Sequence, residues 1–257
     1  MIRILKWILA LAVLAWLGAC GFLYFAQRSL LYFPQGTRLP ASETDFSIVD
    51  QGLSLRGWVL NPGQADAVLY FGGNGDAVQK SRDLLAQWAP QRTVYMLAYR
   101  GYGASDGSPT ELGLFADAMA LYDAVSPHHH GIAAIGRSLG TGVASYLAAQ
   151  RPVERLALIT PYDSIARLGQ RQYPMFPVNL LLRDKYESWR YAAQVHCPVL
   201  IVEAQNDQTI PADSTARLQA AFSPPPQFVR MDGAGHNTIL RRPETGAAMT
   251  AFLNPTP

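Results

Sequence analysis

The chain has 257 residues, of which 49% are hydrophobic and 16% charged, and its formal net charge is +2. Such a chain can bury one sizeable core, and α/β folds of this length often form a single domain. The charge is too small, and the basic residues too scattered, for a nucleic-acid surface. We therefore expect one domain that does not bind nucleic acid.

The N-terminal stretch is long and apolar enough to cross a membrane. Residues 7–26 carry no charge and have basic residues on both sides. Twenty helical residues extend about 30 Å, which is the thickness of a hydrocarbon core. The run is longer than the core of a signal peptide, and no Ala-x-Ala site stands out. We predict one transmembrane helix over about residues 4–26, within an anchor of residues 1–34.

Two ways in which this segment could attach the protein to a membrane remain open. The positive charge of the short N-terminal tail favours a cytoplasmic tail, which would place the rest of the chain on the periplasmic side of a bacterial inner membrane. Alternatively, residues 17–20 (Leu-Gly-Ala-Cys) resemble a lipoprotein cleavage site, with Cys20 taking the lipid. The other cysteine is Cys197, and two cysteines so placed do not settle the redox compartment.

Residues 35–257 read as one α/β domain. Residues 46–50 and 53–60 alternate in polarity and predict an antiparallel hairpin. Continuous apolar runs then alternate with helical segments, which predicts a mostly parallel sheet with helices on both faces. The later predicted strands are residues 67–71, 93–98, 131–135, 155–160, 198–202 and 227–231, and the predicted helices are residues 77–89, 111–125, 141–150 and 243–253.

Between two predicted strands, about residues 161–197 are too apolar for a solvated loop. We expect them to form a small helical cap over the C-terminal edge of the sheet. Apolar side chains of such a cap can line an acyl-sized pocket, although they must also pack against the body. Tyr162 and Phe176 are the cap residues we expect to contact a substrate.

A serine lies on a sharp turn between a predicted strand and a predicted helix. The turn is Gly136-Arg137-Ser138-Leu139-Gly140. Glycines two positions before and after the serine let strand and helix approach closely, and the strained turn lifts the hydroxyl clear of the sheet. This arrangement predicts a nucleophile elbow with Ser138 as the nucleophile.

A carboxylate and an imidazole follow two later strands. Asp207 lies in the loop after residues 198–202, and His236 lies in the loop after residues 227–231. Because Ser138, Asp207 and His236 each follow the C-terminal end of a separate strand, we predict that they form a catalytic triad. His236 would take the serine proton, and Asp207 would orient the imidazole. Asp213 and Asp232 are weaker candidates for the acid.

The oxyanion of the reaction needs hydrogen-bond donors. The backbone N–H of Leu139 and one from the Gly72-Gly73-Asn74 turn, most suitably that of Asn74, would supply them. Gly73 would lie beside the substrate. The run His128-His129-His130 has no carboxylate or cysteine spacing around it and reads as a polar loop. We expect no metal and no cofactor.

Residues 98–111 (Ala-Tyr-Arg-Gly-Tyr-Gly-Ala-Ser-Asp-Gly-Ser-Pro-Thr-Glu) resemble a signature of the Bem46-like α/β-hydrolases, relatives of the serine aminopeptidase-type and ABHD-type hydrolases. The resemblance covers nearly the whole chain, from residues 29–34 to residues 233–237. It implies an α/β-hydrolase fold, a Ser-Asp-His triad on the three residues named above and an N-terminal anchor.

The chain departs from the family pattern at three places. Gly72 stands where relatives commonly have histidine, and Ala98 replaces the usual aspartate. Residues 203–205 (Glu-Ala-Gln) replace the more usual His-Gly stretch before the acid, Asp207.

These observations predict a membrane-anchored serine hydrolase that cleaves carboxylic esters or thioesters of acyl or lipid-like substrates through an acyl-enzyme. Two alternatives remain. A serine peptidase could carry the same triad, and an acidic cap patch able to hold an amino terminus would favour it; the cap offers Asp163, Asp184 and Glu187. A non-catalytic interaction protein could also use this fold.

Overall fold

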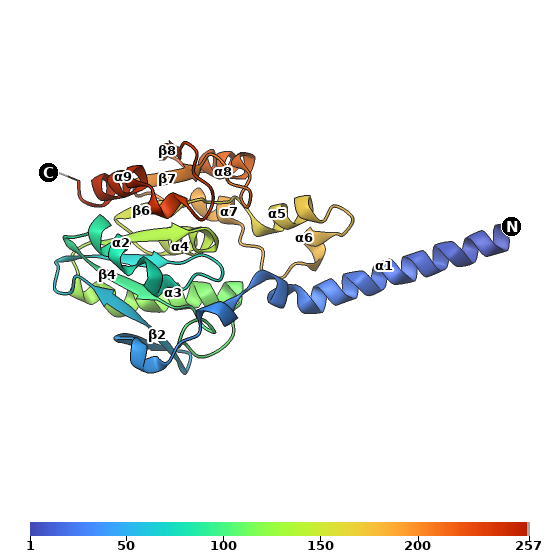
Figure 1. The fold of residues 1–257 in the computed structure, drawn as a ribbon, viewed down its shortest axis with the longest axis horizontal. Helices are drawn as coiled ribbons and strands as arrows, with labels where there is room; N and C mark the ends of the chain where they lie inside the picture. Colours follow the sequence, from blue (N-terminus) through green and yellow to red (C-terminus); the bar gives the residue numbers. More distant parts are fainter. Residues whose placement is uncertain (256–257) are drawn as a thin grey trace.

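The computed structural model describes residues 1–255, and within them one eight-stranded sheet lies between helices and is preceded by a long N-terminal helix (Figure 1). The strands are β1 (Phe46–Asp50), β2 (Leu53–Leu60), β3 (Asp66–Phe71), β4 (Arg92–Leu97), β5 (Ile132–Arg137), β6 (Arg155–Ile159), β7 (Val199–Ala204) and β8 (Gln227–Met231). Their order in the sheet is β1-β2-β4-β3-β5-β6-β7-β8. The predicted α/β-hydrolase architecture is confirmed.

The direction of the strands follows from their connections and their polarity. β1 and β2 form the predicted hairpin, and β2 also pairs antiparallel with β4. Every later pair is parallel. β1 alternates in exposure along its length, whereas β7 is buried throughout. A strand covered on both faces is largely apolar in sequence, as residues 199–202 of β7 are. The carboxyl ends of β5, β7 and β8 therefore meet at one edge of the sheet.

Two layers of helices enclose the sheet. The body helices are α2 (Arg82–Trp88), α3 (Glu111–Val125), α4 (Leu139–Gln150), α8 (Ala212–Gln219) and α9 (Pro243–Leu253). Short 3-10 turns join the elements: Pro34–Thr37, Ala41–Glu43, Val78–Ser81, Ser126–His128 and Ile239–Arg241. α2 packs against α9, and α3 packs against α4. Thr110 caps α3, since its Oγ1 accepts a hydrogen bond from the Gly113 N–H at 2.9 Å.

The N-terminal helix α1 (Ile2–Leu31) projects away from the body (Figure 1). It is the one helix within residues 1–255 that is long and apolar enough to cross a membrane, and residues 1–18 are exposed. The helix is longer than the predicted residues 4–26. Its last turns lie against the cap, where Arg28 forms an ion pair with Asp184 at 2.9 Å. Cys20 is buried on α1, and both cysteines are free thiols.

Three short helices form the cap: α5 (Ile165–Gln172), α6 (Val178–Leu181) and α7 (Ser188–Ala192). Its position differs in part from our expectation. α7 packs against α4 of the body, but α6 contacts α1. Much of the apolar surface of the cap thus faces the N-terminal helix, because α1 offers an equally apolar surface beside it.

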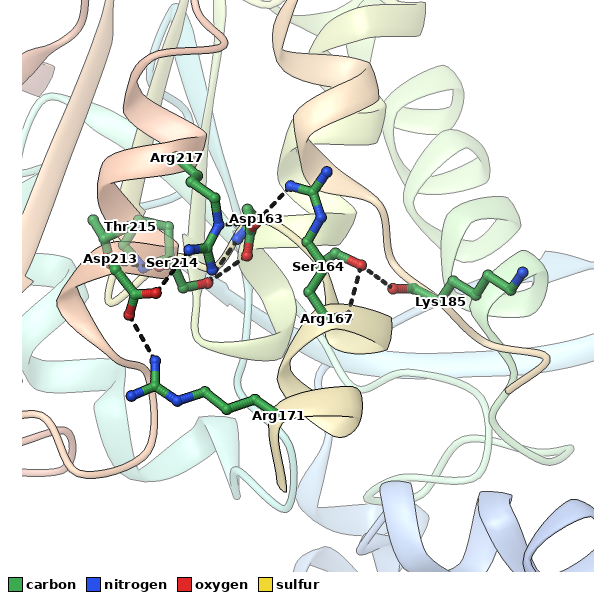
Figure 2. Close-up of polar contacts among 10 residues, drawn as sticks. Asp163, Ser164, Arg167, Arg171, Lys185, Asp213, Ser214, Thr215 and Arg217 are labelled. Carbon is green, nitrogen blue, oxygen red and sulfur yellow. Dashed lines mark hydrogen bonds and ion pairs between the residues drawn. The ribbon is translucent and has the colours of Figure 1, made fainter. Parts of the chain in front are cut away.

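A buried carboxylate fixes the cap to the body (Figure 2). Asp163 has no exposed surface and accepts hydrogen bonds from Ser214 (2.6 Å), Arg217 (2.6 Å) and Arg167 (2.8 Å). Burial alone would raise the pKa of Asp163, but these hydrogen bonds outweigh it and lower the pKa below its usual range. Asp163 therefore stays ionised and ties α5 to α8.

Candidate active site

The predicted elbow is a strained turn between β5 and α4. Ser138 has φ 48° and ψ −119°, values that a non-glycine residue adopts only where the surrounding structure enforces them. The flanking glycines are sterically required. An added Cβ on Gly140 would overlap the backbone oxygen of Phe71, and one on Gly136 would crowd the backbone of Thr141. The turn therefore presents the serine side chain at the carboxyl edge of the sheet.

The structure brings the three predicted triad residues together. Nε2 of His236 lies 2.9 Å from Oγ of Ser138, and Nδ1 of His236 lies 2.8 Å from Oδ2 of Asp207. Both distances fit hydrogen bonds. The side chains of His236 and Asp207 are 12% and 5% exposed. The imidazole can thus reach a serine proton on one side while a carboxylate holds its other nitrogen.

The local environment keeps Asp207 ionised. Its Oδ1 accepts the backbone N–H groups of Thr209 and Ile210, each at 2.8 Å. Burial would raise the pKa of Asp207, but the hydrogen bonds from His236 and from these two amides outweigh it and lower the pKa. The competing candidate Asp213 is engaged elsewhere, since it pairs with Arg171 and Arg217 on the surface (Figure 2).

Two backbone N–H groups close to the serine in the chain or in space are candidate oxyanion donors. Leu139 is the first residue of α4, so its N–H has no partner inside the helix. Gly73 packs so closely that an added Cβ would lie 3.3 Å from Cβ of Ser138. The Gly73 N–H is already directed to Oδ2 of Asp76 at 3.3 Å, which leaves the next N–H in the turn, that of Asn74, as the second candidate donor.

The side chain of Asn74 links this turn to the end of α1. Its Oδ1 accepts the Phe33 N–H at 3.1 Å and the Tyr102 hydroxyl at 2.9 Å. Its Nδ2 donates to the backbone oxygen of Leu31. The candidate oxyanion turn and the N-terminal helix are therefore held in one hydrogen-bonded unit.

Arg137, next to the serine, connects the two loops that flank it. Its Nη1 donates to Oδ2 of Asp76 at 2.8 Å, and its Nη2 donates to Oδ1 of Asn237 at 3.0 Å. Asp76 accepts the Gly73 N–H of the candidate oxyanion turn, and Asn237 directly follows His236. One guanidinium thus links the candidate oxyanion turn to the imidazole loop.

A cleft of about 710 Å³ opens beside the serine, which is within the range of small-molecule sites. Its lining residues are Phe33, Gly36, Gly73, Asn74, Gly75, Asp76, Ala77, Lys80, Arg137, Ser138, Thr209, His236 and Asn237. Gly73, which we expect beside the substrate, is among them. No residue of the cap, about residues 161–197, is in this set.

The two cap residues that we expected to bind substrate lie elsewhere. Tyr162 has no exposed surface, and its hydroxyl donates to the backbone oxygen of Leu139 at 3.1 Å. It supports the elbow from beneath, so the prediction for Tyr162 was wrong. Phe176 lines a separate apolar cavity of about 200 Å³ between α1 and the cap, because the cap turns its apolar side toward α1.

Sequence reasoning missed the polar residues that hold the site together. Arg137 and Asn237 stand next to Ser138 and His236 in the chain, and this adjacency was the available signal. The contact between Asn74 and residues 31–33 had no signal, because it joins segments 41 and 43 positions apart. Lys80 lies at the rim of the cleft and is exposed.

Curated relatives share most of the chain. An uncharacterised protein of Mycobacterium tuberculosis is 36% identical over 90% of this chain and 87% of its own length. The protein bem46 of Schizosaccharomyces pombe is 27% identical over 84% of this chain and 77% of its own. A zebrafish (Danio rerio) lysophosphatidylserine lipase, ABHD12, is 28% identical over 62% of this chain and 50% of its own.

Solved structures share the fold at low identity. The esterase Est1E of Butyrivibrio proteoclasticus, solved with ferulic acid, has a TM-score of 0.69 at 17% identity and covers 81% of this chain and 98% of its own. The esterase Pf2001 of Pyrococcus furiosus has a TM-score of 0.66 at 20% identity and covers 81% and 90%. No protein-family model matches the chain.

Proposed function

Since the chain belongs to the Bem46-like α/β-hydrolase family, we propose that it is a serine hydrolase that cleaves carboxylic esters or thioesters. The observation that carries the proposal is the pair of contacts made by one imidazole, 2.9 Å to the Ser138 hydroxyl and 2.8 Å to the Asp207 carboxylate. Ser138 has a strained backbone and lines a cleft. A substrate in this cleft would therefore lie next to the hydroxyl that the imidazole contacts.

In the proposed reaction, Ser138 Oγ attacks the carbonyl carbon of the ester while His236 Nε2 takes its proton. Asp207 holds Nδ1 and stabilises the imidazolium, and it keeps its own negative charge. The N–H groups of Leu139 and Asn74 stabilise the oxyanion. His236 returns the proton to the leaving alcohol or thiol, and water attacks the acyl-enzyme by the same steps.

We further propose an acyl or lipid-like substrate and a membrane location. Residues 1–34 would anchor the enzyme through α1, and residues 35–257 would form the hydrolase domain, with residues 161–197 inserted as the cap. The lipase name of one relative supports a lipid ester. The apolar length of α1 supports a span of the membrane, and the N-terminal charges favour a domain on the periplasmic side.

The charges of the cap argue against the peptidase alternative. Each of the three cap carboxylates already has a basic partner: Asp163 pairs with Arg167 and Arg217, Asp184 with Arg28, and Glu187 with Arg190. A free amino terminus would have to displace one of these arginines. The cap thus offers no ready site for a cationic substrate end.

The test uses the full chain in detergent and a chromogenic short-chain ester. We expect wild-type turnover with an initial burst of the leaving group, and a loss of about 10⁴-fold or more in kcat for Ser138→Ala. Ser145→Ala is the matched control, because Ser145 is buried in α4, the helix that follows Ser138, and its hydroxyl has no hydrogen-bond partner within residues 1–255. Equal activity of Ser138→Ala and the wild type would refute the proposal.

A further inference from the structure

The cap is attached to α1 at two well-separated levels. Near the end of the helix, Gln27 donates to the Leu181 oxygen at 3.1 Å and accepts the Arg183 N–H at 2.7 Å. Further toward the N-terminus, Nε1 of Trp16 donates to the Met175 oxygen at 3.0 Å. Residues 16 and 27 are about 16 Å apart along a helix. The cap segment therefore runs beside the apolar part of α1 (Figure 1).

This attachment conflicts with a cap that lies wholly in water. If the charge-free residues 7–26 span the membrane, the level of Trp16 is about 15 Å below the surface, near the middle of a core about 30 Å thick. If the cap stayed outside, only residues 2–15 would remain to span. They would extend about 21 Å and would include Arg3 and Lys6.

The composition of the cap segment suits a hydrocarbon surrounding. Residues 173–182 (Tyr-Pro-Met-Phe-Pro-Val-Asn-Leu-Leu-Leu) carry no charge and lie between Arg171 and Arg183. Met175 and Leu180 are 75% and 84% exposed, although exposed side chains of this size are costly in water when they gather in one patch. Arg171 and Arg183, at the two ends, would lie at the depth of the lipid headgroups, where basic side chains are favourable.

Most backbone N–H groups of this segment also have a hydrogen-bond partner inside the protein. Lipid-exposed irregular backbone is excluded from bilayers because its polar groups would lack partners. Here the Gln170 side chain donates to the Phe176 oxygen and accepts the Val178 N–H, each at 3.0 Å. Five further N–H groups of the segment donate to backbone oxygens. They belong to Tyr173, Phe176, Leu180, Leu181 and Leu182. Of the four remaining residues, Pro174 and Pro177 have no N–H to satisfy, and the N–H groups of Met175 and Asn179 have no partner within residues 1–255.

We propose that the cap segment 173–182 is immersed with α1 in one leaflet of the membrane and that the acyl chains of bilayer lipids cover its exposed apolar side chains. The cavity between α1 and the cap, lined chiefly by apolar side chains such as Leu23, Leu168 and Phe176, then lies at the depth of the acyl chains. The inference rests on the proposed anchoring by α1 and is independent of the chemistry at Ser138.

The test places single fluorophores on the full chain in phosphatidylcholine vesicles. In a Cys20→Ala, Cys197→Ala background, an environment-sensitive dye is attached to Met175→Cys or Leu180→Cys. Leu9→Cys reports on α1. His128→Cys is the water-facing control, because His128 is exposed and lies four residues before the amino end of β5, opposite the edge that carries the serine.

We expect lipids with a spin label on the acyl chain to quench the dyes at residues 175, 180 and 9 at least threefold more strongly than the dye at residue 128. Strong quenching at residue 9 could be accompanied by quenching at residues 175 and 180 that is no stronger than at residue 128. This result would overturn the immersion of the cap and leave the anchor in place. Weak quenching at residue 9 would remove the anchor and the inference with it. Neither result would bear on ester hydrolysis.

Discussion

Replacement of Arg137 by methionine tests whether the site depends on the link between its two loops. The variant removes the donors to Asp76 (2.8 Å) and Asn237 (3.0 Å) and keeps much of the side-chain volume. The candidate oxyanion turn and the imidazole loop would then lose the link between them. Each would keep its other contacts, such as those of Asn74 with Phe33 and of His236 with Asp207. We expect an effect on stability and a separate effect on turnover.

The size of both effects follows from the burial of the pair. Loss of one partner of a buried ion pair costs about 3–5 kcal/mol, and because Arg137 and Asp76 are each 12% exposed, we expect the lower end. About 3 kcal/mol lowers Tm by about 6–12 °C in a chain of this length. A shift of about 1 Å in a catalytic group can cost about 100-fold in rate, so we expect kcat to fall by roughly that factor.

The assay compares kcat, KM and Tm of the variant with those of a matched control. Arg151→Met breaks a similar two-bond contact with Asp123, which lies on the surface with exposures of 33% and 54%. Such pairs contribute about 0–1 kcal/mol, so this control should keep wild-type kcat and nearly wild-type Tm. A lowered Tm for Arg137→Met with unchanged kcat would refute a positioning role.

Three further changes have defined outcomes. Asp207→Asn should lower kcat by about 10⁴-fold with little change in the circular dichroism melt, because the imidazole loses its orienting carboxylate; a loss below tenfold would contradict that role. Burial raises the pKa of Glu111 to about 7, so the folded state holds a proton that the unfolded chain releases at lower pH. The Tm of the wild type should therefore fall relative to that of Glu111→Gln as the pH rises from about 5 to 8. A difference between the two Tm values that stays constant over this range would contradict the prediction. Gly140→Ala should prevent soluble expression, because the added Cβ overlaps the Phe71 backbone oxygen, whereas Ala144→Gly in the same helix should leave a folded protein.

Much of the fold could be predicted because local signals agreed with the final structure. The hairpin of residues 46–60 and the helix from Glu111 to Val125 have the predicted bounds. Gly136 and Gly140 marked the turn at Ser138 because only glycine fits where strand and helix approach so closely. Asp207 and His236 could be placed because the ends of parallel strands meet at one edge.

The unpredicted features depend on contacts between distant segments. Tyr162 looked like a pocket residue from its place at the start of the cap, but it packs under the elbow. The extent of α1 was underestimated, since the charge of Arg28 suggests an end to an apolar helix unless its partner Asp184 is known. The direction of the apolar cap surface follows from α1, and no local pattern in residues 161–197 indicates that neighbour.

The most direct measurement is covalent labelling of the full chain with an active-site fluorophosphonate, followed by mass spectrometry of the peptide that contains residues 136–140. We predict one phosphonyl adduct on Ser138 Oγ in the wild type, and its loss in both Ser138→Ala and His236→Ala at an unchanged melting temperature. An unlabelled wild-type Ser138, or labelling that survives in His236→Ala at the wild-type rate, would contradict the assignment of this serine as the nucleophile.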